Sequence, residues 1–405
     1  MGNIKDEAAQ WLDGTAANIT FIVTKDCQLA CKYCYLVGKN DKERMSFLTA
    51  KKAIDYILTS SLFFGRQKSV ILDFIGGEPL LEVELIDKIC DYFKLQTYIR
   101  GHKWFDAYRI NLTTNGLNYH TKKVRKFIEK NITHLSITIT IDGNEIKHDL
   151  NRVYKNSGKG SYKNVLKNIP LWLKDFKDIG TKVTISSADI PYIKESVLHL
   201  FSLGIHHLYT NCVFEDVWKE GDDKLFEEQL SELADIIIDN EYYKDFTCSF
   251  FSENIGKPLD PILENQNWCG AGKMLAVDAA GMFYPCTRFA GYSLREKKPI
   301  IIGNVRDGID KNKLRPFLTL DRTTQSPQKC LDCEVASGCA WCQGENYDAA
   351  ETNTIYQRAT AICLMHKARV RANNYYWNKL YRKLELEGQR EEFEKNKRKV
   401  KPVDC

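Results

Sequence analysis

The sequence lacks a long apolar run, an apolar N-terminal segment and any internal repeat. No stretch approaches the roughly 18 consecutive apolar residues of a membrane-spanning helix, which argues against a membrane protein. The polar N-terminus has no apolar core of a secretory signal, so we expect a cytoplasmic protein. The formal charge of +5 is slight for 405 residues and does not indicate a nucleic-acid partner.

Cysteine, by contrast, is abundant, with 14 in the chain. In a protein without a secretory signal, clustered cysteines bind metal more often than they pair as disulfides. The hydrophobic content of 43% and the charged content of 27% are those of an ordinary globular protein. The length suits two or three domains with substantial cores.

Three of the cysteines, Cys27, Cys31 and Cys34, lie in one short loop after a strand-like run at residues 18–24. Three thiolates at this spacing can hold three irons of a [4Fe–4S] cluster, because soft sulfur ligands suit iron. The fourth iron would then need a ligand from outside the protein. Half of a zinc site, or a set of buried thiols, is the alternative.

Short apolar strands alternate with helices over the first half of the chain. We expect strands near residues 18–24, 69–75, 108–113, 135–141, 182–186 and 207–210, and helices near 46–60, 83–95, 121–130, 162–175 and 192–203. This alternation predicts a parallel sheet with helical crossovers. Six strand–helix units are too few for a closed eight-stranded barrel.

The unusual residues follow the predicted strands at their C-terminal ends, where active sites on such sheets lie. The second strand ends in Gly76-Gly77-Glu78-Pro79. Paired glycines let a backbone approach a ligand closely, and a carboxylate complements an ammonium group. By itself, the same motif could be a structural turn.

The next two strands end in polar residues followed by glycine, Thr113-Thr114-Asn115-Gly116 and Thr140-Ile141-Asp142-Gly143. Such side chains suit a ribose or a carboxylate, and capping of a local turn is the alternative. Arg152 follows a few residues later. It could pair with a ligand carboxylate or hold a loop by a salt bridge.

Seven further cysteines come after the strand–helix region: Cys269, Cys286, Cys330, Cys333, Cys339, Cys342 and Cys363. Two C-x2-C pairs are also typical of a zinc ribbon, so a zinc-bearing scaffold protein without enzymatic activity is an alternative from another class. Between the two regions the βα alternation is lost, and a helix near residues 224–240 is expected to bridge them.

In combination, the C-x3-C-x2-C loop, the GGEP motif and the later cysteines resemble the radical S-adenosylmethionine (SAM) enzymes that carry a SPASM extension. The resemblance spans roughly residues 18–370. It implies an α/β fold with a partial (β/α)6 barrel, and SAM bound to the open iron and cleaved to a 5′-deoxyadenosyl radical. It also implies SAM contacts from Tyr33 beside the adenine and from Gly76, Gly77, Glu78, Pro79, Asn115, Thr140, Asp142 and Arg152.

The resemblance further implies two auxiliary clusters, making three [4Fe–4S] clusters in all. By position, Cys269, Cys286 and Cys342 would hold auxiliary cluster I, and Cys330, Cys333, Cys339 and Cys363 would hold auxiliary cluster II. One departure is that two residues separate Cys339 from Cys342 where the family usually has three. With three thiolates, cluster I could accept a substrate cysteine, unless Cys248 or, less favourably, Cys90, Cys212 or Cys405 fills the position.

We therefore expect a maturase that forms thioethers in a Cys-containing, ribosomally made precursor peptide, as sactipeptide and ranthipeptide synthases do. Residues 362–374 further resemble maturases of peptides with repeated Cys-x-x-x units. A sulfatase-maturating enzyme that makes formylglycine, or a maturase that forms C–C crosslinks, is the alternative. A reductant such as flavodoxin or ferredoxin is implied, and the catalytic residues are not identified.

The predicted organisation has five segments: an N-terminal arm (1–17), the barrel (18–223), a bridging helical region (224–262), the SPASM domain (263–373) and a charged C-terminal helix and tail (374–405). We expect no discrete leader-binding module, because fewer than thirty residues precede Cys27. The last segment is dense in Lys, Arg and Glu, which favours a solvated helix face over a site for an acidic peptide.

Overall fold

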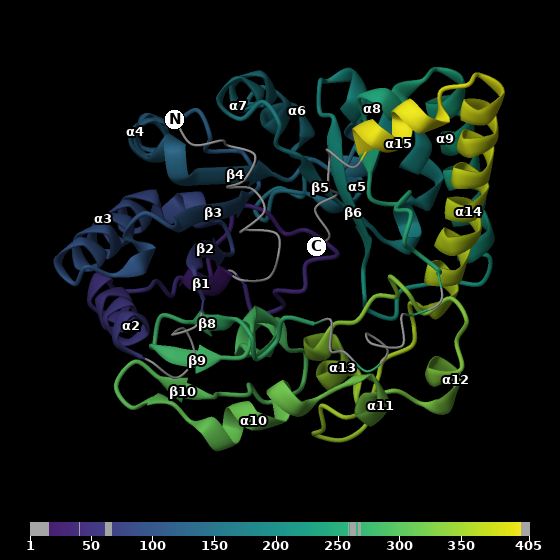
Figure 1. Ribbon diagram of the computed structural model, residues 1–405. Coiled ribbons are helices and arrows are strands. Elements are labelled where there is room, and N and C mark those ends of the chain that lie inside the picture. The colour runs from purple at the N-terminus through teal and green to yellow at the C-terminus, as the bar shows by residue number, and fades with distance from the viewer. Residues whose placement is uncertain are drawn as a thin grey trace.

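The computed structural model describes residues 16–39, 41–60, 67–257, 259, 265 and 269–397. The predicted arm therefore lies almost wholly outside the described residues. Six parallel strands succeed one another in the first half of the chain: β1 (Ala16–Thr24), β2 (Ser69–Gly76), β3 (Tyr108–Thr114), β4 (Leu135–Ile139), β5 (Thr181–Ile185) and β6 (His207–Cys212). Helices cover their outer side (Figure 1), which confirms the predicted partial (β/α)6 barrel.

The barrel wall is divided between β4 and β5. Strands β1 to β4 belong to one sheet, and β5 and β6 form a second sheet with the short parallel strand β7 (Thr247–Cys248). The side chain of Thr181 bridges the division, because its hydroxyl donates to Ile139 O (2.6 Å) and accepts from the Ile141 N–H (3.2 Å). The wall thus continues across the break through a side chain.

The helices around the barrel are α2 (Phe47–Thr59), α3 (Val83–Ile99), α4 (Lys122–Asn131), α5 (Glu145–Asn151), α6 (Tyr162–Leu166), α7 (Ile169–Asp175) and α8 (Ile193–Ser202). Ser46 caps α2, with its Oγ accepting from the Thr49 N–H (3.0 Å). The helix expected at residues 162–175 is two helices. Pro170 stands in the first turn of α7, where it has no N–H to continue the preceding helix.

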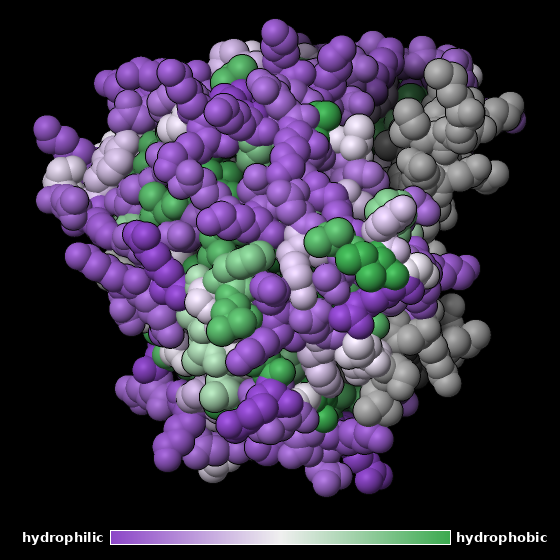
Figure 2. All heavy atoms as spheres, turned by 90° about the vertical axis from the view of Figure 1, so that its left-hand side faces the viewer, coloured by the Kyte–Doolittle hydropathy of each residue, from purple (hydrophilic) through white to green (hydrophobic). Residues whose placement is uncertain are grey.

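The helices of the outer layer are amphipathic. Ile86, Ile89 and Phe93 of α3 are fully buried against the sheet, whereas Leu95 and Ile99 near its end are exposed. Figure 2 shows the face formed by α2, α3 and α4 as mostly hydrophilic, with separate apolar patches. This arrangement is the usual one for helices that pack one face on a sheet.

The C-terminal half of the chain extends the barrel sheet beyond its first strand. Strand β8 (Leu275–Val277) pairs in parallel with β1, and β9 (Met282–Tyr284), β10 (Gly303–Asn304) and β11 (Gly308–Ile309) follow as antiparallel neighbours. The strand order is β11-β10-β9-β8-β1-β2-β3-β4. The part of the chain that carries the later cysteines is therefore joined by strand pairing to β1, the strand that leads into the first cysteine loop.

Seven α-helices follow β6 in the described chain: α9 (Asp222–Asp239), α10 (Lys311–Thr319), α11 (Arg322–Gln325), α12 (Gln328–Leu331), α13 (Gln343–Ala349), the long α14 (Cys363–Leu386) and α15 (Arg390–Lys397). Helix α14 runs unbroken through the expected boundary at residues 373 and 374. Among the described helices, none is both long and apolar enough to cross a lipid bilayer.

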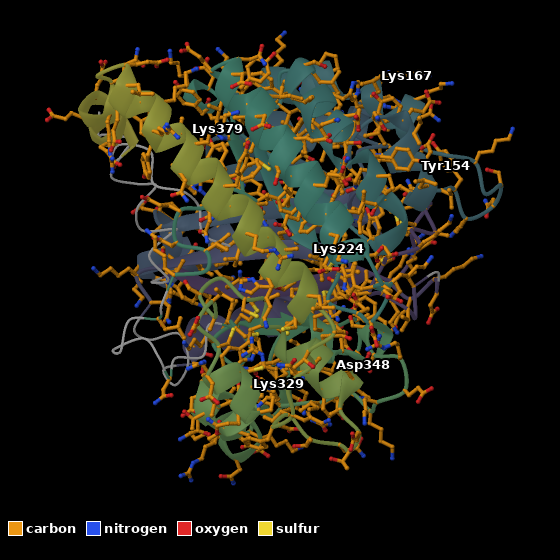
Figure 3. All side chains as sticks on the ribbon, turned by 90° about the vertical axis from the view of Figure 1, so that its right-hand side faces the viewer. Tyr154, Lys167, Lys224, Lys329, Asp348 and Lys379 are labelled. Atoms are coloured by element: carbon orange, nitrogen blue, oxygen red, sulfur yellow. The ribbon has the colours of Figure 1, made fainter. Side chains whose placement is uncertain are left out.

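Helix α14 lies along α9 beside the barrel (Figure 3), and the charge run seen in the sequence faces an acidic helix there. Lys379 contacts Asp235 (2.8 Å), and Arg371 contacts Glu227 (2.6 Å). Because exposed ion pairs add little stability, these pairs fix the orientation of α14 more than they hold it in place. The helix is held in place by the burial of its apolar side chains, such as Leu380.

Candidate functional site

The cysteine loop at residues 27–34 leaves β1 at the C-terminal edge of the sheet, and the end of β2 docks directly on it. The Gly77 N–H donates to Thr24 O (2.9 Å), and the Glu78 N–H donates to Asp26 O (2.8 Å). A Cβ on Gly76 would lie 2.3 Å from Thr24 O, and one on Gly77 would lie 2.2 Å from Asp26 O. In the structure, the paired glycines allow the chain to approach itself, where we expected an approach to a ligand.

A second segment, the strap (residues 151–161), holds the other side of the cysteine loop. The Ala30 N–H donates to Val153 O (2.8 Å), and the Lys155 N–H donates to Gln28 O (3.0 Å). Tyr154 of the strap is labelled in Figure 3. A cavity of about 340 Å³ between strap and loop is lined by Cys27 and Gln28, so the loop is accessible from this side.

The surroundings of Cys27 and Cys31 favour the neutral thiol over the thiolate. Burial, together with the nearby Glu78 carboxylate, raises the pKa of Cys27 to about 12. Burial also raises the pKa of Cys31, with the thiol of Cys34 as a further cause. Bound metal would have to displace these protons, as it does in thiolate sites generally. Adjacent thiols near a surface cavity are a donor set that fits iron.

Glu78 joins the ends of β2 and β3. Its side chain is 1% exposed, and it accepts from Thr114 Oγ1 (2.6 Å), the Asn115 N–H (2.7 Å) and the Leu80 N–H (3.0 Å). Burial raises the pKa of this carboxyl, and the hydrogen bonds partly offset the effect. Because a carboxylate offers about four acceptor positions, one remains for an ammonium group.

Tyr33, Asp142 and Arg152, three predicted SAM contacts, meet in one buried group. The Tyr33 hydroxyl donates to the Asp142 carboxylate and accepts from Arg152 Nη1 (3.0 Å). Asp142 also accepts from the Thr184 N–H (3.1 Å). Burial favours a raised pKa for Asp142, but the nearby Lys147 and Arg152 outweigh it and leave the pKa below its usual value.

Arg152 has one buried donor without a partner. Its side chain lies at the end of α5 and is 6% exposed, and its Nε has no hydrogen-bond partner among the described residues. A buried donor without a partner is costly, so it indicates a missing acceptor. The carboxylate of SAM is an acceptor of the right charge. Asn115, another predicted polar contact, donates to Gln28 Oε1 (3.1 Å), and the buried Thr140 donates its N–H to Thr114 O (2.9 Å).

A buried ion pair fixes the helix that carries Arg152. Lys147 of α5 contacts Asp189 of the 3-10 turn η4 (Ser187–Tyr192) at 3.2 Å, and both side chains are fully buried. Lys147 also donates to Thr184 O (2.9 Å). The neighbouring His148 has its pKa lowered to about 3 by burial and by Arg152, so it is neutral at physiological pH.

Replacing Asp189 with alanine is expected to destabilise the apoprotein by about 3–5 kcal/mol, because Lys147 would stay buried without its partner. Urea denaturation followed by circular dichroism measures this loss. As a control, Glu145→Ala removes an exposed pair with Lys163, and it is expected to cost below about 1 kcal/mol. Equal, small losses in both variants would contradict the prediction.

The structure brings Cys269, Cys286 and Cys342 together below the barrel. Burial raises the pKa of Cys286, and the thiols of Cys269 and Cys342 raise it further. The Sγ of Cys342 also caps α13 by accepting from the Glu345 N–H (3.5 Å). Three thiols thus form the set that we expected to hold auxiliary cluster I, and their chemistry fits iron.

Cys330, Cys333, Cys339 and Cys363 form the other predicted set. Burial raises the pKa of Cys339 to about 11, and the other three thiols contribute. Figure 3 shows sulfur atoms gathered between the lower end of α14 and Lys329. Among the described residues, no three Cys, His, Asp or Glu side chains converge on a single-ion site. In a cubane the thiolates bind different irons, so the ligands of a cluster do not converge in that way.

The remaining cysteines lie apart from these sets. Cys248 is buried in β7, where its thiol hydrogen-bonds Thr210 and faces Arg369 of α14. Cys212 at the end of β6 also faces Arg369. Cys90 is buried within α3, and Cys405 lies outside the described residues.

Sequence reasoning missed the arginines that accompany the later cysteines. Arg288 lies near Cys342, and Arg358 Nη2 donates to Cys339 Sγ (3.3 Å). Arg358 also stacks over Trp341 at 4.9 Å from the ring centroid. The position of Arg288, two residues after Cys286, was visible in the sequence. The carboxylate partners of Arg288, Glu215 and Glu345, could not be recognised in the sequence, because they come from distant segments.

Residues 21–207 match the family described as the Radical SAM superfamily. The uncharacterized protein MJ0907 of Methanocaldococcus jannaschii is 30% identical over 296 residues, which cover 72% of this chain and 89% of that protein. The chain belongs to the radical SAM superfamily. Members of this family bind SAM and a [4Fe–4S] cluster, and the donor sets described above fit both.

Two named relatives are more distant. The radical SAM cyclopropyl synthase TigE of Paramaledivibacter caminithermalis is 20% identical over 348 residues (80% of this chain, 66% of that protein). The serine-type anaerobic sulfatase-maturating enzyme of Bacteroides thetaiotaomicron is 25% identical over 346 residues (77% and 78%).

Two solved structures share the fold over most of the chain. The enzyme anSMEcpe with bound AdoMet and a Cp18Cys peptide superposes with a TM-score of 0.66 at 16% identity, covering 91% of this chain and 98% of that one. Streptococcus suis SuiB bound to its precursor peptide SuiA gives 0.57 at 13% identity, covering 89% and 79%. At these identities the likeness shows the fold, which is that of SPASM-type radical SAM enzymes.

Proposed function

We propose that this protein forms thioether crosslinks between Cys thiols and carbon atoms of a ribosomally made precursor peptide. The observation that carries the proposal is the grouping of three thiols, Cys269, Cys286 and Cys342, while Cys248 packs elsewhere, against Thr210. A cubane held by three thiolates keeps one iron for an external sulfur. A substrate cysteine is the ligand that such a site fits.

The residues at the barrel edge would position SAM. Glu78 would accept from its amino group, and Arg152 would donate from the unpartnered Nε to its carboxylate. Asp142 keeps Arg152 and Tyr33 in place through the hydrogen bonds described above. Cys27, Cys31 and Cys34 would hold the cluster beside it.

When bound, SAM and its cluster supply a 5′-deoxyadenosyl radical that removes a hydrogen atom from a substrate carbon. Formation of the bond between that carbon and sulfur requires loss of the thiol proton and of one electron, and a cluster held by Cys269, Cys286 and Cys342 would supply an acceptor for that electron. This chain contributes the protein ligands and the positive charge around them, while the cofactors carry the chemistry.

A peptide substrate is supported by the relatives. SuiB is seen with its precursor peptide, and anSMEcpe with a Cys-containing peptide. Formylglycine formation is the second candidate, because one relative is a sulfatase-maturating enzyme. Those enzymes carry an extra cysteine soon after the first auxiliary one. Here residues 270–275 are Gly-Ala-Gly-Lys-Met-Leu, which favours the thioether reaction.

The deciding experiment incubates the reduced enzyme with SAM and a Cys-rich precursor. Thioether formation removes two hydrogens per bond and leaves that thiol unreactive toward iodoacetamide. A modified peptide whose thiols all still alkylate would contradict the proposal. Metal analysis after anaerobic purification tests the scaffold alternative, since three cubanes require about twelve irons per chain and a zinc ribbon requires none.

The Arg152→Gln variant is expected to bind SAM about 10- to 100-fold more weakly, since one charge-assisted hydrogen bond is worth about 1.5–3 kcal/mol. Isothermal titration of the anaerobic holoprotein with SAM measures the affinity. Arg125→Gln, which removes the partner of Asp175 on the outside of the barrel, is the control. Unchanged SAM affinity in Arg152→Gln would exclude the proposed role.

Three further predictions belong to this proposal. A flavodoxin- or ferredoxin-like reductant would supply electrons, and the reaction would take place in the cytoplasm. The chain would divide into the segments given above with one change: because α14 is continuous from residue 363 to residue 386, we place residues 374–386 with the SPASM domain.

A further inference from the structure

Arg288 occupies an unusual position between the two cysteine regions. It lies in the 3-10 turn η6 (Thr287–Phe289), directly after Cys286, and its side chain is 13% exposed. Its guanidinium stacks on the ring of Tyr35, 4.7 Å from the centroid. Tyr35 is the residue after Cys34. The Arg288 side chain thus contacts the residue that follows the cysteine loop. Its backbone lies two residues after Cys286, one of the three cysteines assigned to auxiliary cluster I.

The guanidinium is held there by two carboxylates from separate segments. Arg288 Nη2 contacts Glu215, beyond β6, at 3.0 Å and Glu345 of α13 at 2.6 Å. Glu345 in turn contacts Arg295 at 2.7 Å. A Cβ on Gly344 would lie 2.3 Å from the Cβ of Arg288, so this glycine is what allows α13 to approach.

The guanidinium of Arg288 also lies near the thiol of Cys342. Its Nε is buried and has no partner among the described residues. A fixed cation and an unpaired donor beside cysteines are among the protein features that set the potential of an iron–sulfur cluster.

We propose that Arg288 is a positioning residue that fixes one positive charge between the cysteine loop and the Cys269, Cys286 and Cys342 set, and that this charge raises the reduction potential of auxiliary cluster I. The inference rests on the proposed function. A positive charge stabilises the reduced cluster, which carries one more negative charge. Without it, Glu215 would lose this partner and Glu345 would keep only Arg295, so the two carboxylates would oppose reduction more strongly.

The test is a redox titration of the anaerobic holoprotein monitored by electron paramagnetic resonance. The signal of auxiliary cluster I is the one that disappears in Cys286→Ala. Arg288→Gln is expected to shift the midpoint of that signal to a more negative potential and to leave the midpoint of auxiliary cluster II unchanged. Arg288→Lys keeps the charge and is expected to stay close to the wild type. The double variant Arg288→Gln/Glu345→Gln is expected to have a midpoint between that of Arg288→Gln and that of the wild type, because one negative charge is removed as well.

Arg306→Gln is the matched control, because Arg306 belongs to the same half of the chain and pairs with Asp307 in solvent. It is expected to shift no midpoint. An unmoved auxiliary midpoint in an iron-replete Arg288→Gln would overturn the proposal, as would loss of four irons in both the Gln and the Lys variants. Loss of four irons in Arg288→Gln but not in Arg288→Lys would support the proposal, because it would show that auxiliary cluster I depends on the positive charge at this position. A wild-type protein without iron would instead refute the proposed function itself.

Discussion

Replacing Cys31 with alanine is expected to remove the SAM cluster and abolish formation of 5′-deoxyadenosine. Two thiolates would remain in the loop, too few to retain a cubane with an open iron. Iron content should fall from about twelve to about eight per chain, because the later cysteines are untouched. Colorimetric iron analysis and chromatography of the nucleoside products measure both effects.

Cys90→Ala is the matched control for this prediction. Cys90 is as deeply buried as any cysteine of the loop, but it lies within α3 among apolar neighbours. Its removal leaves a small cavity and should lower stability without changing iron content or SAM cleavage. Deoxyadenosine production by Cys31→Ala at the wild-type rate would contradict the assignment of the loop.

The fold of the barrel was predictable because its signals are local. The strands are short and mostly apolar, three of them (β2, β3 and β4) lead into polar residues and glycine, and the crossover helices have apolar stripes of their own. The cap at Ser46 needs only the residues that follow it. The GGEP motif was recognisable for the same reason, although its glycines are required by contacts with Thr24 and Asp26, which the sequence does not reveal.

The joining of the two halves was not predictable, because it depends on contacts between distant segments. Strand β8 is three residues long, and nothing in Leu275-Ala276-Val277 indicates that it pairs with β1. Likewise, Arg288 and Glu345 are 57 residues apart in the chain and meet only once α13 has docked. The cysteines themselves were found by their spacing, but the charges around them come from the tertiary structure.

Cys342→Ser is expected to separate SAM cleavage from thioether formation. The Cys342 side chain has two roles: it caps α13 by accepting from the Glu345 N–H, and by our assignment it is a ligand of auxiliary cluster I. Serine is a good helix cap, so the first role is preserved. A hydroxyl is a poor ligand for the irons of a cluster, so the second role is lost.

The variant should therefore bind about eight irons and still convert SAM to 5′-deoxyadenosine in the presence of precursor peptide. The peptide, however, should keep all of its thiols reactive toward iodoacetamide, because no open auxiliary iron receives the substrate sulfur. Retained SAM cleavage shows that the barrel has folded, so the loss of crosslinks cannot be ascribed to misfolding. Thioether formation by Cys342→Ser at the wild-type rate would mean that auxiliary cluster I takes no part in forming the bond.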